Sequence, residues 1–376
     1  MTGARMMKAQ VLHAIGDLCY EEVPVPQPAD GEVLLRVRAA GICGSDVPRI
    51  CENGAHVMPL IPGHEFSGEM AETGARVGIF PLIPCRKCPQ CGQGHYELCR
   101  HYDYVGSRRD GAFAEYVSVP AANLIPLPEG VSFEEAAMAE PMAVAVHAMR
   151  RGFRTLGIDI TDTDAVKDRV REMSVAVIGA GTIGLLLAMF LIDAGVKSLY
   201  VTGNKDTQKE RALSLGGPRE RCVNSRETDA AAWLRDRTNG GADLVFECVG
   251  RADTYAMAVD AAAPMGGVVL MGNPYGDMML PRDIYWKILR NQLTLTGTWN
   301  SSFDYPDETG SNGLSGQTAG SVTDDWHYVI SRLEAGTVRP ASLITHRLPL
   351  SELGRGIAIM RDKTEDYCKI MVVYER

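Results

Sequence analysis

The feature that most constrains the fold is the run Gly179-Ala180-Gly181-Thr182-Ile183-Gly184 and its setting. The apolar residues 175–178 (VAVI) before it predict a buried strand, and residues 182–194 after it predict a helix that ends at Gly195. A GxGxxG pattern that follows a strand and opens a helix is typical of a dinucleotide-binding site. The sequence therefore predicts a dinucleotide-binding site here.

Each glycine of this run has a distinct expected role. Gly179 permits the tight turn, Gly181 lets the backbone approach the pyrophosphate, and Gly184 lets the helix pack closely on the strand. Thr182 and Ile183 begin the helix, and this N-terminal end of the helix faces the phosphates. We expect all five residues to border the cofactor.

Strands and helices continue to alternate after this motif. Further strands are expected at residues 198–202, 242–248 and 267–271, with helical stretches between them. This alternation is typical of βαβ units and predicts a doubly wound parallel sheet.

The two ends of the chain have a different pattern. Short alternating runs bounded by turn formers occur at residues 33–37, 76–80 and 114–119, and a final strand is expected near residues 369–374. They predict a partly antiparallel, barrel-like domain interrupted by the nucleotide domain. We therefore expect an α/β protein with domain segments 1–150, 151–298 and 299–376.

Charge and hydropathy exclude several classes of partner. With 38 basic and 47 acidic residues the net charge is −9, which argues against nucleic acid or an anionic membrane as the partner. The longest apolar run, residues 183–192, is too short to cross a bilayer. Because the N-terminus continues directly into a strand pattern without an apolar signal core, we expect a cytoplasmic protein.

Four cysteines lie within 15 residues of one another. Cys85, Cys88, Cys91 and Cys99 provide the four thiolates of a tetrahedral zinc site, and Arg86 and Lys87 inside the loop offset its negative charge. With every position taken, such a site is structural. An iron–sulfur cluster is the alternative, although the final gap and the lack of a Pro after the fourth Cys depart from ferredoxin spacing.

A second set of metal-binding residue types is dispersed before the nucleotide domain. It contains one thiol, one imidazole and one carboxylate, in Cys43, His64 and Glu140. Three protein ligands with an open fourth position are what a catalytic zinc requires. Glu65, beside His64, is an alternative source of the carboxylate, and each residue taken alone also has an ordinary structural explanation.

The end of the second nucleotide-domain strand bears on cofactor choice. A site that selects NAD usually has a carboxylate there for the ribose hydroxyls, whereas this chain has Gly203-Asn204-Lys205. Because Lys205 can pair with a 2′-phosphate, NADP is favoured over NAD. The alternative is that Lys205 only starts a solvated helix.

These residues together carry a family resemblance. The GHE motif at 63–65, the four-Cys loop, GAGTIG and Glu140-Pro141 resemble the zinc-containing medium-chain alcohol and polyol dehydrogenases over nearly the whole chain. CGSDVPRI, YDYVGSRRDGAFAEY and KILRNQLTLTGTWN are most similar to the branch that oxidises galactitol 1-phosphate.

The resemblance implies a fold and a cofactor set. It implies a GroES-like, partly antiparallel β-barrel catalytic domain plus a Rossmann domain, with catalytic and structural Zn, NAD(P) and a homo-oligomer, either dimer or tetramer. By the resemblance, Cys43, His64 and Glu140 match the catalytic ligands and the four-Cys loop matches the structural zinc.

The expected reaction transfers hydride from a secondary alcohol to the nicotinamide. By the resemblance, Ser45 begins the proton relay, and Pro48 replaces a relay His found in some relatives. A metal lowers the pKa of the alcohol, and Ser45 then passes the proton outward.

The expected substrate is a sugar alcohol or its phosphate. Candidate phosphate ligands are Arg49, Arg108 and Arg109, and Trp299, Asn300 and Ser301 are candidates for the same pocket. The alternatives are an unphosphorylated polyol or L-threonine dehydrogenase, and, in another class, a nucleotide-binding sensor without catalysis.

Overall fold

The structure is a computed structural model that describes residues 5–159, 163–216, 221–306 and 324–374. The chain divides into two compact units. Unit 1 comprises Met1–Pro141 and Ser302–Arg376, and unit 2 comprises Met142–Ser301. Unit 2 is therefore an insertion in the sequence of unit 1.

Unit 2 contains a six-stranded parallel sheet in the order β12-β11-β10-β13-β14-β15. Its strands are β10 (Ser174–Ile178), β11 (Ser198–Gly203), β12 (Cys222–Asn224), β13 (Ala242–Glu247), β14 (Ala262–Leu270) and β15 (Thr294–Gly297). Its helices are α5 (Thr163–Glu172), α6 (Thr182–Asp193), α7 (Asp206–Ser214), α8 (Ala230–Arg237), α9 (Ala252–Ala261) and α10 (Arg282–Arg290), and α4 (Ala139–Thr155) enters from unit 1. This strand order is that of a doubly wound dinucleotide-binding sheet.

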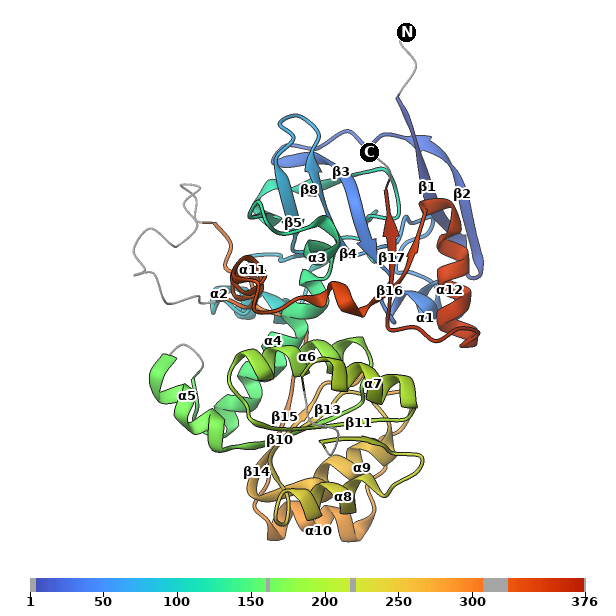
Figure 1. The fold of residues 1–376 in the computed structure, drawn as a ribbon. Coiled ribbons are helices and arrows are strands. Elements are labelled where there is room, and N and C mark those ends of the chain that lie inside the picture. The colour runs from blue at the N-terminus through green and yellow to red at the C-terminus, as the bar shows by residue number, and fades with distance from the viewer. Residues whose placement is uncertain (1–4, 160–162, 217–220, 307–323, 375–376) are drawn as a thin grey trace. The chain divides into compact units, whose positions relative to one another are not determined.

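Burial explains why the sequence of this sheet reads as apolar runs. Four of the five residues of β10 are buried, and α6 is apolar over most of its length. Figure 1 shows α6 and α7 on one face of the sheet and α8 and α9 on the other. Strands covered on both faces need continuous apolar sequence, which confirms the predicted parallel sheet.

Unit 1 contains a mixed sheet and two small ones. Its strands are β1 (Met6–Ala14), β2 (Asp17–Pro24), β3 (Glu32–Gly41), β4 (Glu65–Met70), β5 (Arg76–Ile79), β6 (Leu82–Ile83), β7 (Asp103–Tyr104), β8 (Tyr116–Pro120), β9 (Leu124–Pro126), β16 (Ile344–Leu348) and β17 (Lys369–Val373). Its helices are α1 (Asp46–Pro48), α2 (Pro89–Gly92), α3 (Phe133–Ala137), α11 (Asp325–Ala335) and α12 (Leu353–Asp362). The main sheet has the order β16-β17-β3-β4-β5-β9, with β8 also paired to β3.

The expected barrel is not closed by the strand pairs of the described residues. The β1–β2 hairpin is a separate sheet, and β1 meets the rest of unit 1 through isolated bridges at Ala9–Ala114 and Leu12–Leu60. Pro59 and Pro62 flank Leu60, and since proline has no N–H donor the ladder cannot extend there. The sheet is also mixed, because β16 and β17 are parallel.

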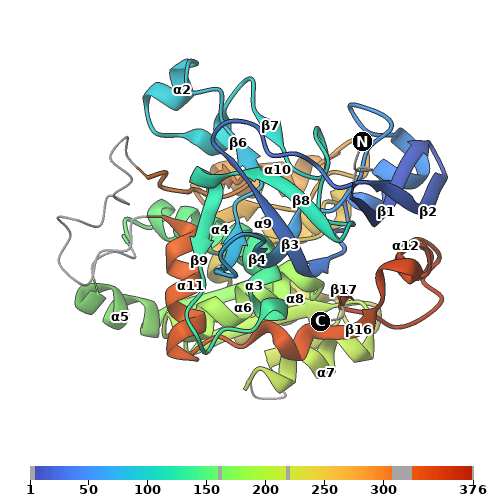
Figure 2. The same ribbon diagram turned by 90° about the horizontal axis from the view of Figure 1, so that it is seen from above.

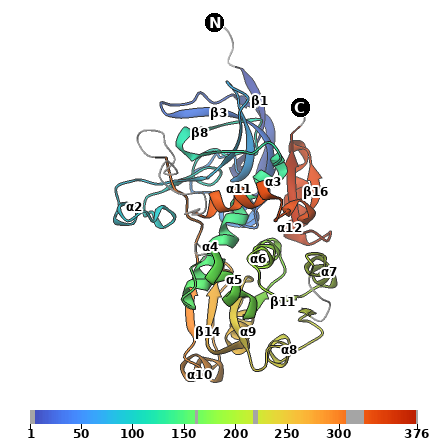
Figure 3. The ribbon, with the colours of Figure 1, turned by 60° about the vertical axis from the view of Figure 1, so that its left-hand side comes forward.

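The core of unit 1 joins segments that are far apart in sequence. Ile42, Leu348 and Ile370 are buried in one cluster, and Gly356 of α12 lies against all three. Figure 3 shows α12 beside β16, while Figure 2 shows α2 and the β1–β2 hairpin at opposite ends of unit 1. The C-terminal segment therefore completes the sheet that the N-terminal segment begins.

Among the described residues, every helix is too short or too polar to cross a membrane.

Candidate active site

The four cysteines of the Cys85–Cys99 loop converge on one point. All four sulfur atoms lie within 4.8 Å of one another, with Sγ–Sγ distances of 3.5 Å for Cys88–Cys91, 3.9 Å for Cys88–Cys99 and 4.0 Å for Cys85–Cys91. A tetrahedral zinc with Zn–S bonds of about 2.3 Å places its sulfurs about 3.8 Å apart. The donor set and its spacing therefore fit zinc.

Backbone groups of the loop favour the thiolate form of Cys88, whereas burial raises the pKa of the Cys91 thiol. The N–H groups of Arg100 and Cys91 lower the pKa of the Cys88 thiol to about 6. The Arg86 guanidinium lies over the ring of Tyr305, 4.6 Å from its centroid, so its charge is held near the loop. These contacts fit a site that carries several thiolates.

The dispersed set also converges, with one difference from the expectation. Ligand atoms of Cys43, His64 and Glu65 lie within 4.8 Å of one another, and Glu140 is not part of that group. Cys43 follows β3 in the turn before α1, and His64 precedes β4, which pairs with β3. Sheet pairing thus brings the thiol and the imidazole together.

A buried carboxylate that the sequence analysis did not single out organises this group. Asp46 is fully buried and accepts a hydrogen bond of 3.0 Å from the Cys43 N–H. Its Oδ1 atom lies 3.5 Å from Nδ1 of His64 and also forms an ion pair with Arg49. Burial alone would raise the pKa of Asp46, but His64 and Arg49 hold it below its ordinary value. A carboxylate behind a histidine is the usual arrangement around a metal ligand.

His64 is held in an anionic environment. Burial alone would lower the pKa of His64, yet the Asp46 carboxylate and the Cys43 thiol raise it well above its ordinary value. Its Nδ1 has no hydrogen bond within the described residues. The negative surroundings that stabilise positive charge on His64 would also stabilise a bound cation, so this group fits a metal.

Glu140 and Glu65 have different partners. Tyr104 donates a hydrogen bond of 3.0 Å to Oε1 of Glu140, and burial raises the pKa of this carboxyl group. Glu65 instead pairs with Lys369, which also donates to the carbonyl of Ile42 at 3.0 Å. Since Lys369 and Glu65 are only 3% and 2% exposed, each charge depends on the other.

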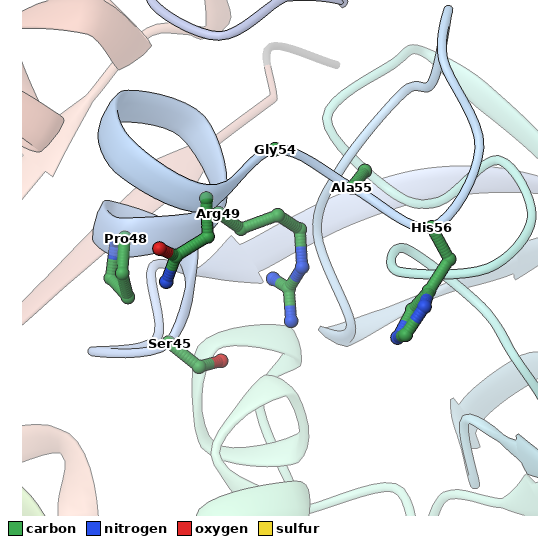
Figure 4. A pocket seen from close by; sticks show the side chains of 7 residues that line it. Ser45, Pro48, Arg49, Gly54, Ala55 and His56 are labelled. Atoms are coloured by element: carbon green, nitrogen blue, oxygen red, sulfur yellow. The ribbon is translucent and has the colours of Figure 1, made fainter.

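A cavity of about 380 Å³ lies beside this group. It is lined by Ser45, Pro48, Arg49, Asn53, Gly54, Ala55 and His56. Ser45 links the two, because its hydroxyl donates to Sγ of Cys43 at 3.3 Å. Figure 4 shows the Arg49 guanidinium, from a helical turn, and the His56 ring, from the following loop, extending toward the side where the Ser45 hydroxyl lies.

Arg108 and Arg109 do not line this cavity. Arg108 lies over the ring of Tyr102 at 4.5 Å, and Arg109 forms an ion pair of 2.6 Å with Glu32. The loop that carries them packs on the GHE motif: a Cβ at Gly106 would lie 2.2 Å from the carbonyl oxygen of Gly63. This close approach gives GSRRDG a structural reason for its glycines.

The glycine run of unit 2 has the geometry expected for a cofactor turn. Gly179 follows β10 with a φ of 106°, and a Cβ at Gly184 would lie 1.9 Å from its carbonyl oxygen. Gly181 caps α6, and a Cβ there would meet nothing within 4 Å. The open backbone at Gly181 and the start of α6 at Thr182 and Ile183 leave room for a pyrophosphate.

The end of β11 has no carboxylate in the sequence position where NAD-selective folds place one. Gly203 ends the strand, the Asn204 N–H donates to Gln208 at 2.9 Å, and Lys205 caps α7. Among the ion pairs of the described residues, none involves Lys205. Its charge is therefore available to an anion.

Three predicted pocket residues lie at the end of unit 2. Trp299 is 57% exposed, Ser301 is buried, and the Asn300 side chain accepts a hydrogen bond from the Ser301 N–H at 2.9 Å. Trp299 is thus not a core residue, and its role as a substrate contact stays a prediction.

Four residues of the site were missed by sequence reasoning. Asp46 and Tyr104 stand inside motifs already quoted, so local sequence contained a signal for them. His56 stands close to Arg49 in a loop. Lys369 begins the last strand and has no local signal.

Comparisons with known proteins match both parts of the chain to dehydrogenase families. The family model described as alcohol dehydrogenase GroES-like domain matches residues 29–129, and that described as zinc-binding dehydrogenase matches residues 182–310. Galactitol 1-phosphate 5-dehydrogenase of Escherichia coli (strain K12) is 35% identical over 315 residues, which cover 80% of this chain and 85% of that protein.

Two further matches extend over more of the chain. L-threonine 3-dehydrogenase of Bacillus licheniformis is 29% identical over 364 residues, which cover 91% of this chain and 92% of that protein. A solved structure of a proposed zinc-binding dehydrogenase from Sinorhizobium meliloti 1021 bound to NADP has a TM-score of 0.82 at 26% identity, covering 98% of this chain and 100% of that one.

Proposed function

Because this chain belongs to the zinc-containing medium-chain alcohol and polyol dehydrogenases, we propose that it oxidises a secondary alcohol of a phosphorylated sugar alcohol with NAD(P). Membership makes the chain an oxidoreductase and removes the non-catalytic sensor considered from the sequence. The observation that carries the substrate proposal is the cavity beside Cys43, which combines the Ser45 hydroxyl with Arg49 and His56.

We propose that Cys43, His64 and Glu140 hold the catalytic zinc, and that Cys85, Cys88, Cys91 and Cys99 hold the structural one. Glu140 is preferred over Glu65 as the third ligand because Glu65 already neutralises the buried Lys369. When bound, zinc supplies a Lewis acid that lowers the pKa of the substrate hydroxyl.

The choice between the two glutamates is testable through zinc affinity. Glu140→Gln should weaken binding of the catalytic zinc at least about tenfold, since even outer partners of metal ligands contribute that much. Glu65→Gln should weaken it less. Competition with a chelator measures both, and the opposite order would make Glu65 the ligand.

Ser45 is proposed to receive the substrate proton. Its hydroxyl lies 3.3 Å from Sγ of Cys43 and borders the cavity, so it touches both the metal group and the space where an alcohol binds. Pro48 also lines this cavity and offers no titratable group, so the proton leaves through Ser45 toward solvent. Ser45→Ala should lower kcat more than it raises KM.

The phosphate is proposed to bind Arg49 and His56. One Nη atom of Arg49 pairs with Asp46, and a guanidinium has five N–H donors, so others remain for a phosphate in the cavity. His56 is exposed and adds a second donor on the same cavity wall.

A substrate panel tests this phosphate site. Arg49→Ala should raise KM for a phosphorylated polyol about 10- to 100-fold relative to its unphosphorylated parent, as expected for loss of a charge-assisted hydrogen bond. Because Arg49 also pairs with Asp46, general damage would affect both substrates alike, and the ratio isolates the phosphate. Arg108 lies outside the cavity, so Arg108→Ala is the matched control.

The same panel separates the alternatives. If Arg49→Ala affects both substrates equally and the enzyme turns over a free polyol or L-threonine faster, that compound becomes the proposed substrate in place of the phosphorylated polyol.

NADP is proposed as the preferred cofactor, supported by Lys205 and by the absence of an acid at Gly203 and Asn204. Lys205→Ala should raise KM for NADP more than KM for NAD. Equal efficiency of the wild-type enzyme with both cofactors, or a clear preference for NAD, would contradict the proposal.

A homo-oligomer, dimer or tetramer, is also proposed. Strand β15 is at the edge of its sheet, and α10 has no buried residue although Tyr285, Trp286 and Leu289 are apolar. A strand at a sheet edge and a group of exposed apolar side chains are each features of an interface. Light scattering on the purified protein tests it, and a monomeric mass would contradict it.

A further inference from the structure

The β1–β2 hairpin brings three metal-binding side chains onto one face, and they share no residue with either zinc group described above. In its register Val11 is opposite Cys19 and Ala9 is opposite Glu21, so Cys19 and Glu21 share a face. His13 lies two residues after Val11 and therefore joins that face. Because the register shifts between Leu12 and Ala14, the backbone of His13 is not paired with a residue of β2, at the end of the hairpin.

These side chains are close enough to share one ion. Ligand atoms of His13, Cys19 and Glu21 all lie within 4.8 Å of one another. Nε2 of His13 is 3.2 Å from Oε1 of Glu21. Sγ of Cys19 is 3.3 Å from Oδ1 of Asp17, which places a second carboxylate beside the thiol.

We propose that His13, Cys19 and Glu21 form a third metal site, for a borderline divalent transition cation such as Zn²⁺. One thiolate, one imidazole and one carboxylate are ligands that zinc accepts, and a water completes the tetrahedron. The site does not rest on the proposed function, because none of its residues takes part in the catalytic group.

The electrostatics of the hairpin favour a cation at this position. The carboxylates of Asp17 and Glu21 lie beside the Cys19 thiol and the His13 imidazole and make the local field negative. The same negative field attracts a metal ion, and coordination displaces the thiol proton.

The site is also accessible. The side chains of His13 and Glu21 are 40% and 38% exposed. They also line a cavity of about 530 Å³, which Arg109 and Tyr116 border from other segments. A cation bound here would therefore exchange with solvent, unlike one in the buried cysteine loop.

Alkylation of Cys19 tests the site directly. The purified zinc-loaded protein is treated with a maleimide at a series of buffered free Zn²⁺ concentrations, and labelling of each cysteine peptide is followed by mass spectrometry. Zn²⁺ should slow the labelling of Cys19 at least about tenfold at saturation, because a coordinated thiolate is no longer a free nucleophile. Cys51, which belongs to no metal-binding group, is the internal reference.

Two variants decide whether the effect belongs to a site. His13→Ala should shift the Zn²⁺ concentration for half-protection of Cys19 at least about tenfold upward. His346→Ala is the matched control, since His346 has the same kind of contact with Glu365, at 3.1 Å, without a thiol in its group. It should leave the protection unchanged.

Elemental analysis gives an independent measurement. After equilibration at the protecting concentration, Cys19→Ala should hold one zinc fewer per chain than the wild type. Equal zinc content, equal half-protection in His13→Ala and wild type, or no protection of Cys19 would each overturn the site.

Discussion

Replacing Lys369 by Met leaves the carboxylate of Glu65 buried without its cation. Since the two side chains are 3% and 2% exposed, removing one partner should cost about 3 to 5 kcal/mol. For a unit of 150 to 250 residues each kcal/mol lowers Tm by about 2 to 4 °C, so Lys369→Met should lower the transition of unit 1 by about 10 °C. Differential scanning calorimetry measures this shift.

Two further variants give this prediction its control. Lys369→Met combined with Glu65→Gln should recover at least half of the loss, because no charge then remains buried. Lys8→Met removes a lysine from an exposed pair with Glu22, 3.2 Å long, and should cost at most about 1 kcal/mol. A loss for Lys369→Met no larger than that for Lys8→Met would refute the idea that Lys369 neutralises Glu65.

Three shorter predictions concern other parts of the chain. Gly184→Ala should abolish measurable cofactor binding in a fluorescence titration, since its Cβ would lie 1.9 Å from the Gly179 carbonyl oxygen. The hydrogen bond to Asp324 raises the pKa of His327 above its ordinary value. The stability that the His327–Asp324 pair contributes is therefore complete below the pKa of His327 in the unfolded chain and is lost as pH rises through its pKa in the folded protein. His327→Gln should flatten that part of a curve of Tm against pH. Tyr104→Phe removes a 3.0 Å hydrogen bond to the proposed third zinc ligand and should weaken zinc binding about 10- to 100-fold in chelator competition.

Features set by short-range sequence were predictable. The four-Cys loop converges because its ligands are neighbours in the chain, and the glycine turn follows from a strand, a positive φ and a helix start in one continuous segment. The strand expected at residues 175–178 is β10, and that at 198–202 is β11. In such segments, the residues that determine the local structure are neighbours in the sequence, so the sequence alone is enough to predict it.

Features that depend on partners from distant segments were not predictable. Glu65 was considered as an alternative metal ligand, but its ion pair with Lys369, 304 residues away, has no signal in the local sequence. Arg109 was read as a phosphate ligand, but the fold pairs it with Glu32. A side chain's chemistry states what it can bind, and only the tertiary arrangement decides which partner it receives.

The sequence did not predict that the barrel-like sheet stays open, for a related reason. Alternating runs predict strands, but the number of bridges that β1 makes depends on the backbone donors of its neighbour. The prolines beside Leu60 remove those donors.

The discontinuity of unit 1 has a consequence for the order in which a ribosome delivers its parts. The Cys85–Cys99 loop carries all its proposed zinc ligands within one short stretch, so under that proposal the ion binds while most of the protein is still being translated. The buried pair at Glu65 cannot form until Lys369, seven residues from the C-terminus, has been synthesised. A nascent chain halted before that point would contain every proposed ligand of the first zinc but would leave the Glu65 carboxylate without its cation.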